Sequence, residues 1–414
     1  MDTRIDPRPV FDPAEIDRID LVDPVLHAEY DLAQVWRTLR DEAPAYRHRE
    51  TEGGEGFWVV TRRDDMAALY KDNTSFTSAR GNMLNTLLAE SDSAVGRMLT
   101  VTDGPEHTAL RAVLTKPFSM RALTSIVDSV KRATARLIEE ATRRQSCDFS
   151  ADIAAHIPLA AMCDLLGVPD ADRAHLVELT SSTLAAADGA PTEEGTWTAR
   201  NELLLYISEL AEARRDNPRE DVVSLLVDQE VDGRKLTSEE IIFNCYSIII
   251  GGLETTRFAM IGGVHALANH PDQWRALIEG TVNTDTAVEE ILRWTTPTLH
   301  SGRRATADLL LHGQLIEAGD IVTMWNGSAN RDERVFAEPE QFLLDRGDAH
   351  KHLTFAHGPH YCMGAYLAKA ELAAMVEALR SKVAEIRMAG PAKRVYSNFL
   401  SGYGSLPVTL VPAS

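Results

Sequence analysis

The chain has 414 residues, of which 44% are hydrophobic, and it carries a formal net charge of −20. So acidic a protein is not expected to bind nucleic acid or an anionic membrane surface, and its composition is that of an ordinary globular protein. The length alone allows about two to three domains of average size, or one large core built around a cofactor.

We expect no targeting segment and no membrane anchor. The first residues, Met-Asp-Thr-Arg-Ile-Asp-Pro, lack the apolar core of a secretory signal. The longest apolar stretch, around 241–253, contains Asn244 and falls short of the ~20 residues that span a bilayer. Cysteines occur without paired spacing, at Cys147, Cys163, Cys245 and Cys362. This usage predicts reduced thiols in a cytoplasmic protein.

In chain order, the patterns predict a mainly α-helical protein with a minor β-sheet region. Residues 1–30, rich in Asp and Pro, are expected to form an irregular lead-in, and residues 31–414 a single domain. Strands are expected at 56–61 and within 299–325 and 386–412. Helical patterns fill most of the remainder, at 30–40, 64–71, 122–142, 151–166, 170–187, 200–215, 219–228 and 238–270.

Two pairs of charged residues at helical spacing have an ordinary explanation when each is considered alone. His107 and Arg111 lie four residues apart near the start of a predicted helix, so they share a face that would usually be a solvated basic surface. Glu290 and Arg293 lie three residues apart, and on a surface such a pair stabilises a helix by only about 0.3 kcal/mol. Neither pair identifies a function by itself.

The longest predicted helix begins with a capping box at 237–240, and its first half is apolar on all sides, which predicts a buried central helix. Gly251 and Gly252 lie inside it, although each glycine costs a helix about 1 kcal/mol. They make room for a group close to the backbone, with Thr255 on the same face. The alternative is close packing against another helix, with Glu254 exposed to solvent.

The most informative stretch is 355–364, Phe-Ala-His-Gly-Pro-His-Tyr-Cys-Met-Gly. Gly358 begins a turn and helix formers follow from Ala365, so Cys362 stands at a helix N-terminus. Unpaired N–H groups and the positive end of the helix dipole favour the thiolate, which is the form that binds metal. A lone thiolate does not complete a zinc site, but it can be the single protein ligand of a haem iron. The alternative is a simple buried cysteine.

This stretch resembles the haem-binding loop of the cytochrome P450 family, the haem-thiolate monooxygenases, in its soluble bacterial form. The family pattern, Phe-x-x-Gly-x-His-x-Cys-x-Gly, matches at Phe355, Gly358, His360, Cys362 and Gly364. Three neighbouring positions depart from the residues that are usual in the family: Ala356, Pro359 and Tyr366. They leave the ligand in place and bear only on packing beneath the haem.

The resemblance implies the mainly α P450 fold, with haem b (iron protoporphyrin IX) between the long central helix and the cysteine loop. The implied activity is that of a monooxygenase (EC 1.14), which inserts one oxygen atom of O2 into a small organic substrate by hydroxylation or epoxidation. Alternatives are a P450-type oxidase that couples or desaturates its substrate, and a non-catalytic haem-binding sensor. The resemblance also suggests a role in natural-product biosynthesis, that is, in secondary metabolism.

The resemblance assigns roles to individual residues. Cys362 is expected to be the axial iron ligand, and Glu254 and Thr255 match an acid–alcohol pair that relays the protons needed to cleave dioxygen. Cations at four positions, His107, Arg111, Arg303 and His360, are expected to hold the haem propionates, with Arg304 as the alternative to Arg303 if the register shifts by one. The other residues expected next to the cofactor are Gly251, Gly252, Phe355 and Gly364.

Glu290 and Arg293 match a buried structural ion pair of the family. The usual third member is a cation, and Gln341 stands at its position here.

The substrate and the electron donor are less closely defined. Residues expected in the substrate pocket are Met83, Leu87, Leu253, Leu299, His300 and Leu400, from segments that also include 178–199. They suggest a partly polar small molecule, free or bound to a carrier protein. Because no flavin or nicotinamide domain is present, a ferredoxin and a ferredoxin reductase are expected to supply electrons. The expected docking site near the cysteine contains three cations, Lys351, His352 and Lys369.

Overall fold

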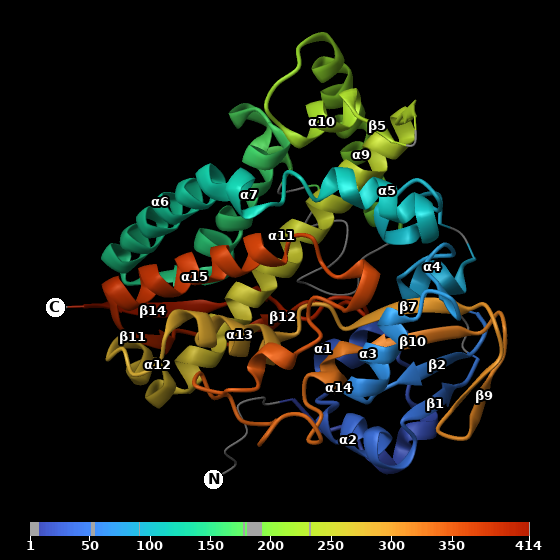
Figure 1. Cartoon of the computed structure of the whole chain (residues 1–414). Helices are drawn as coiled ribbons and strands as arrows, with labels where there is room; N and C mark the ends of the chain where they lie inside the picture. Colours follow the sequence, from blue (N-terminus) through green and yellow to red (C-terminus); the bar gives the residue numbers. More distant parts are fainter. Residues whose placement is uncertain are drawn as a thin grey trace.

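The computed structural model describes residues 8–50, 54–90, 92–176, 179, 193–231 and 233–413. It confirms a mainly helical protein with small sheets (Figure 1). The helices are α1 (Pro24–Glu29), α2 (Ala33–Glu42), α3 (Arg63–Lys71), α4 (Leu84–Leu88), α5 (Gly104–Leu114), α6 (Met120–Arg144), α7 (His156–Leu166), α9 (Glu193–Asp216), α10 (Val222–Asp228), α11 (Ser238–Asn269), α12 (Pro271–Ile278), α13 (Thr284–Thr295), α14 (Asn326–Ala329) and α15 (Ala365–Lys382).

Most strands belong to two sheets. The strands are β1 (Ala45–His48), β2 (Phe57–Val60), β3 (Phe76–Thr77), β4 (Ser146–Asp148), β5 (Glu230–Val231), β6 (Arg234–Lys235), β7 (His300–Ala305), β8 (Leu309–Leu311), β9 (Gln314–Ile316), β10 (Ile321–Trp325), β11 (Val383–Met388), β12 (Lys393–Arg394), β13 (Tyr403–Ser405) and β14 (Pro407–Pro412). The larger sheet has the order β1-β2-β10-β7-β3, and only the β2–β10 pair is parallel. The second sheet has the order β11-β14-β4.

Helix α11 is the predicted central helix, and Figure 1 shows it crossing the middle of the molecule, where it contacts both α7 and α15. Its capping box forms as expected, since the Thr237 hydroxyl accepts from the Glu240 N–H at 3.2 Å and the Glu240 carboxylate accepts from the Thr237 N–H at 2.7 Å. The helix ends at Asn269, just before Pro271. Among the described residues, no helix is both long enough and apolar enough to cross a bilayer.

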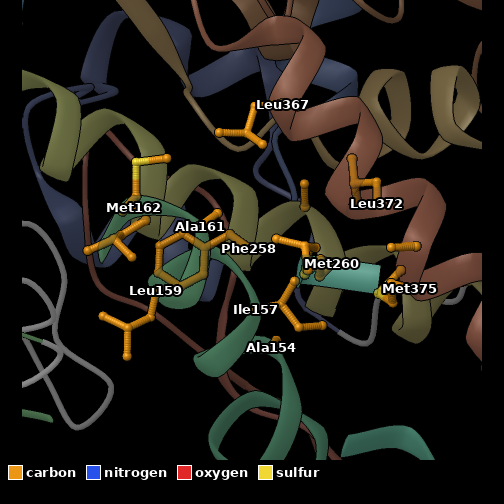
Figure 2. Packing of buried hydrophobic residues seen from close by; sticks show 14 of the residues in the cluster. Ala154, Ile157, Leu159, Ala161, Met162, Phe258, Met260, Leu367, Leu372 and Met375 are labelled. Atoms are coloured by element: carbon orange, nitrogen blue, oxygen red, sulfur yellow. The ribbon is translucent and has the colours of Figure 1, made fainter. Parts of the chain in front are cut away.

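The largest hydrophobic core joins α7, α11 and α15. Figure 2 shows residues of all three helices interdigitating, among them Met162 from α7, Phe258 from α11 and Leu372 from α15. Each of these three side chains exposes less than a twentieth of its surface. Burying such side chains contributes roughly 1.5–3 kcal/mol each, so this core fixes how α11 and α15 lie relative to each other.

The N-terminal lead-in is more ordered than expected from its Asp and Pro content. It contains a 3₁₀ helix, Pro13–Arg18, and α1, and each begins with proline after an Asp whose side chain caps the helix. Asp-Pro therefore starts helices here, because proline is favoured in a first turn. Ile19, Leu21 and Leu26 are buried in a core that also contains Trp325. The description of the lead-in as irregular therefore does not hold for Pro13–Arg18 and Pro24–Glu29, and residues 1–7 lie outside the described residues.

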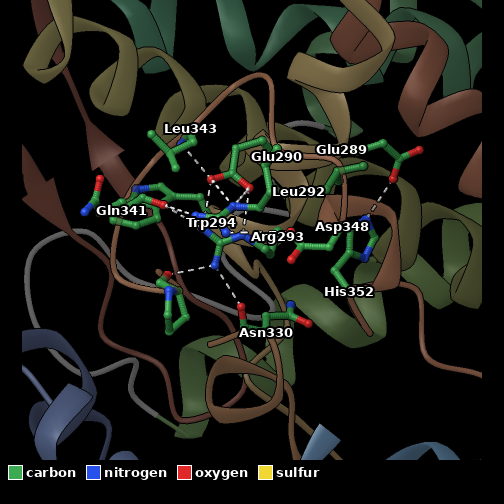
Figure 3. Close-up of polar contacts among 12 residues, drawn as sticks. Glu289, Glu290, Leu292, Arg293, Trp294, Asn330, Gln341, Leu343, Asp348 and His352 are labelled. Carbon is green, nitrogen blue, oxygen red and sulfur yellow. Dashed lines mark hydrogen bonds and ion pairs between the residues drawn. The ribbon is translucent and has the colours of Figure 1, made fainter. Parts of the chain in front are cut away.

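The Glu290–Arg293 pair is completely buried, with both side chains at 0% exposure (Figure 3). The guanidinium donates from Nε to one carboxylate oxygen at 2.7 Å and from Nη2 to the other at 2.8 Å. It also donates to the backbone carbonyls of Asn330, Pro339 and Gln341 at 2.9–3.0 Å. This is an internal latch between α13 and a distant loop, and the surface interpretation of the pair is excluded.

The third member of this latch, and its second cation, is Arg346. Its Nε lies 3.3 Å from Glu290 Oε2, and its side chain is only 3% exposed. Gln341, expected at this position, contributes its backbone carbonyl (Figure 3), while its side-chain amide donates to the exposed Glu338 at 2.8 Å. The expectation that a neutral amide replaces the cation was therefore wrong, because the chain supplies the charge five residues later.

Two substitutions distinguish these roles. Arg346→Gln should lower the free energy of unfolding by about 3 kcal/mol, because it removes a cation from a buried ion cluster. Gln341→Ala should change it by less than about 0.5 kcal/mol, because only an exposed side chain is lost. Urea unfolding of both variants measures the difference, and similar losses in the two variants would show that Arg346 is not part of the latch.

Candidate active site

The cysteine loop lies between the end of the Leu353–Phe355 segment and α15. The Cys362 N–H donates to the carbonyl of Phe355 at 3.0 Å and closes the loop. Burial raises the pKa of the Cys362 thiol, and the N–H groups of Gly364 and Ala365 and the charge of Arg111, which lower the pKa, do not offset the effect of burial. As a residue Cys362 is exposed, whereas Cys147, Cys163 and Cys245 are buried. Cys362 is therefore not the simple buried cysteine of the alternative interpretation.

Two residues of the loop have left-handed backbone conformations. Gly358 has a φ of +69°, and any Cβ there would lie 2.5 Å from the carbonyl oxygen of Tyr70, so only glycine fits. Ala356 stands where the family usually has glycine, and its φ of +56° is unfavourable for alanine by about 1–2 kcal/mol. This departure from the pattern therefore leaves the loop geometry intact at the cost of local strain.

The two glycines of α11 have different surroundings. Gly251 is exposed, and a Cβ added to it would meet no atom within 4 Å. A Cβ on Gly252 would lie 2.4 Å from the sulfur of Met162 in α7. Gly252, predicted to lie beside the cofactor, instead permits close packing of α7 against α11. Gly251 therefore leaves open space next to the backbone, as one explanation predicted, and Gly252 allows close helix packing, as the other predicted.

Next to Gly251 lie the two predicted proton-relay residues. The Thr255 hydroxyl donates to the Gly251 carbonyl at 2.6 Å, which holds the side chain on the open side of α11. Glu254 is 3% exposed, so it is not the solvent-facing residue of the alternative interpretation. Its two carboxylate oxygens accept from Arg257 Nη1 at 3.2 and 3.3 Å.

His107 and His360 come together from α5 and the cysteine loop, with ring centroids 4.3 Å apart. Burial lowers the pKa of His107 to about 4, and His360 and Arg111 act in the same direction. Its Nε2 is buried and has no hydrogen-bond partner among the described residues. His360 Nε2 lies 2.8 Å from Asp103 Oδ1, so this ring nitrogen is already engaged.

Asp103 is a site residue whose role was not foreseen from the sequence. Besides His360, its carboxylate accepts from the Thr77 hydroxyl at 2.7 Å and from the Ser78 N–H at 2.6 Å. Burial raises the pKa of Asp103, but the hydrogen bonds from His360, Thr77 and Ser78 outweigh it and hold the pKa well below its usual range. Its position before a proline at the start of α5 suggested only turn chemistry.

The register of β7 separates the two adjacent arginines. Arg303 is 7% exposed and donates to the carbonyl of Gly302 at 2.6 Å, and no acidic side chain in the described part of the chain forms an ion pair with it. Arg304 points the other way and pairs with Glu55 at 2.7 Å and Glu90 at 3.1 Å. Arg303 therefore keeps its charge available inside the protein, while that of Arg304 is used at the surface.

The fourth cation, Arg111, donates from Nη2 to the carbonyl of Tyr361 at 2.5 Å, next to Cys362. Burial lowers the pKa of Arg111, and the thiol of Cys362 acts in the opposite direction.

These residues suit a flat group that carries carboxylates and needs one thiolate. The buried His107 Nε2 requires a hydrogen-bond partner, because an unsatisfied buried polar group is unfavourable by about 1–3 kcal/mol, and the buried Arg303 guanidinium has donors beyond the one that Gly302 accepts. Cys362 is an exposed cysteine, and Gly251 offers backbone without a side chain. The observed residues thus fit haem, as the sequence resemblance implied.

Several predicted pocket residues belong to the core instead. Leu87, His300 and Leu400 expose at most 1% of their surface, so they contribute almost nothing to a cavity. Leu253 exposes 5% and also packs in the main core. Met83 and Leu299 are half-buried and remain compatible with a pocket wall. Of the predicted segment 178–199, and of the predicted helix 170–187, most lies outside the described residues.

His300 has a structural role that alternation along β7 explains. Its ring packs against Trp325 at 4.9 Å and Phe399 at 5.5 Å, and Nε2 accepts from the Leu84 N–H at 3.0 Å. Burial lowers the pKa of His300 to about 3, so the ring is neutral. It attaches the start of α4 to β7 rather than facing substrate.

The predicted basic docking site is largely neutralised. His352 is buried, with Nε2 3.2 Å from Glu289, and Lys369 donates to the same carboxylate at 2.5 Å. Only Lys351 of the three is exposed. Glu289 was not considered because it precedes Lys369 by 80 residues in the chain.

Comparison with known proteins agrees with this geometry. The sequence model described as Cytochrome P450 matches residues 193–380. The chain is 46% identical to cytochrome P450 NovI of Streptomyces niveus, over 97% of this chain and 99% of that protein. It is 31% identical to the steroid C26-monooxygenase of Mycolicibacterium smegmatis, over 96% and 97%. The crystal structure of P450 OxyD, involved in the biosynthesis of vancomycin-type antibiotics, superposes with a TM-score of 0.88 at 33% identity, covering 95% of this chain and all of that one.

The β7 register yields a test with adjacent residues. Arg303→Gln should speed the transfer of haem from the protein to an excess of apomyoglobin about tenfold or more, because a charge-assisted bond of about 1.5–3 kcal/mol is lost. Arg304→Gln should leave the rate near that of the unmodified protein, because this side chain pairs with Glu55 and Glu90. The transfer is followed by absorbance, and a larger effect at Arg304 would refute the assignment.

Proposed function

The chain belongs to the cytochrome P450 family, and from that premise we propose that Cys362 is the thiolate ligand of its haem. The family binds haem b through a cysteine thiolate, and the chain is an oxidoreductase of the monooxygenase type. The observation that supports the assignment to Cys362 is that it is exposed, unlike the other three cysteines, and lies at the start of α15, where the N–H groups of Gly364 and Ala365 act on its thiol. The comparisons do not favour a coupling oxidase or a non-catalytic sensor.

When bound, the haem supplies the oxidising chemistry that inserts one atom of O2 into the substrate with two electrons and two protons. His107, Arg111, Arg303 and the remaining ring nitrogen of His360 orient it by binding its propionates. Thr255, held by the Gly251 carbonyl at 2.6 Å, keeps a hydroxyl on the open side of α11. Glu254, held by Arg257 beside the open side of α11, supplies the acid of the proton relay, and Gly251 leaves space next to the Thr255 hydroxyl.

Redox partners are implied by the family, and we propose that they are a ferredoxin and its reductase. In support, the region around the cysteine loop exposes Tyr361, Tyr366 and Lys351. We also propose a cytoplasmic location, in which the free thiols stay reduced.

The proposed substrate is an intermediate of natural-product biosynthesis, presented on a carrier protein. Support comes from the relatives, since OxyD takes part in the biosynthesis of vancomycin-type antibiotics and another neighbour, PksS, is the cytochrome P450 of a bacillaene polyketide synthase. PksS superposes with a TM-score of 0.84 at 29% identity. Met83 and Leu299, which are half-buried, are the proposed contacts for the acyl group that the carrier protein presents.

The ligand assignment predicts a distinctive spectrum. The dithionite-reduced holoprotein with carbon monoxide should show the strongly red-shifted Soret band of thiolate-ligated haem. Cys362→Ser should abolish that band, and Cys147→Ser, a substitution in β4, should preserve it. A Soret band of histidine-ligated haem in the unmodified protein would refute the assignment.

The carrier hypothesis predicts a difference in binding. A panel of small carboxylic acids is titrated into the holoprotein, each acid both free and as a thioester on the phosphopantetheine arm of a carrier protein. We consider the acid that gives the largest change in the Soret band. For this acid, the concentration that gives half of the maximal change should be at least tenfold lower for the carrier-bound form than for the free form. Carrier protein with an empty arm is the control, and equal midpoints would show that the carrier is not recognised.

A further inference from the structure

Glu254 and Thr255 are adjacent in α11 but point to different sides of it. Successive residues of a helix are rotated by about 100°, so the two side chains diverge. Thr255 lies on the open side of Gly251, with its hydroxyl on the carbonyl of that residue. The Glu254 side chain is only 5% exposed and is paired with Arg257 one turn later. The acid is therefore held beside the open side of the helix rather than on it.

Arg257 joins Glu254 to a different part of the fold. Its Nη1 donates to both oxygens of Glu254, at 3.2 and 3.3 Å, and its Nη2 donates to the hydroxyl of Ser150 at 3.0 Å. Ser150 is completely buried in η3 (Ser150–Ala154), the short helical segment that packs against α11. The Ser150 N–H donates to Asp148 at 2.9 Å, which fixes the serine in turn.

The planar guanidinium explains why an arginine occupies this position. One nitrogen reaches the carboxylate and another reaches the hydroxyl in a fixed geometry, which a lysine ammonium does not reproduce. The Arg257 side chain is 15% exposed, so the pair is shielded from water and its interaction is stronger than that of a surface pair.

We propose that Arg257, anchored by Ser150, is a positioning residue that holds the Glu254 carboxylate on the η3 side of α11. It thereby sets the place from which the acid serves Thr255 in the proton relay. The proposal rests on the proposed function, since it assumes that Glu254 belongs to that relay. A proton-relay acid must be held within hydrogen-bond reach of its partner or of one bridging water, so a displacement of Glu254 alters proton delivery.

The first test measures the pairing without using activity. A double-mutant cycle with Glu254→Gln, Arg257→Gln and the double variant is measured by urea unfolding of the holoprotein. The unfolding equilibrium constant of the double variant should differ at least tenfold from the value that two independent effects give. The matched control is Asp272→Asn with Arg275→Gln, an exposed pair with the same spacing in α12, which should show less than twofold coupling. Coupling below twofold at Glu254 and Arg257 would overturn the proposal.

The second test measures proton delivery. With a ferredoxin, its reductase, NADPH and the acid that gives the largest Soret change, one measures the share of consumed O2 released as hydrogen peroxide. Arg257→Gln should raise this share at least threefold with an unchanged carbon monoxide spectrum, because a displaced acid delivers protons less well. Arg257→Lys and Ser150→Ala should give intermediate values, and Arg275→Gln should match the unmodified protein.

An unchanged peroxide share in Arg257→Gln would overturn the positioning role even if the cycle shows strong coupling. If Arg257→Gln does not fold, Ser150→Ala carries the test, because it keeps the ion pair and removes only its anchor. A missing thiolate spectrum in the unmodified protein would refute the proposed function instead, and the unfolding cycle would still report whether Arg257 holds Glu254.

Discussion

The buried ion pair between Glu290 and Arg293 is the interaction that holds the helical part of the molecule to the cysteine loop. Arg293 donates to the carbonyl of Asn330, whose side chain accepts from the Leu353 N–H at 2.7 Å and donates to Thr354 at 3.0 Å. Leu353 and Thr354 lead directly into the loop. Because these groups are removed from water, loss of a partner leaves a buried charge or dipole unpaired, which penalises other arrangements of the loop.

The need of buried polar groups for hydrogen-bond partners also distinguishes the latch from the candidate active site. In the latch, the donors of Arg293 meet a carboxylate and three carbonyls. At the active site, and within the described part of the chain, His107 Nε2 has no hydrogen-bond partner and the Arg303 guanidinium donates to the carbonyl of Gly302 alone. The donors of Arg293 are thus used within the protein, whereas the Arg303 guanidinium can still bind a ligand. Asp103 holds His360 in this site, because its carboxylate binds both His360 and Thr77 of β3.

Helix α11 shows how one short segment serves packing and chemistry together. Gly252 lets Met162 of α7 approach, and that contact fixes the rotation of the helix. With the rotation fixed, Gly251 and Thr255 face the open side and Glu254 faces η3, where Arg257 holds it. A shift by one residue would exchange these faces, so the α7 contact and the proposed relay depend on each other.

The sequence by itself determined the mainly α class, the capped central helix and the cysteine at a helix start, since turns, caps and helix faces depend on neighbours within a few residues. Only the tertiary structure decided which of Arg303 and Arg304 faces inward, that Arg346 rather than Gln341 completes the latch, and that His300 and Leu87 lie in the core. These outcomes depend on strand register and on packing between segments far apart in the chain. Local periodicity carries no information about either, because it shows that a face is apolar but not which partner covers it.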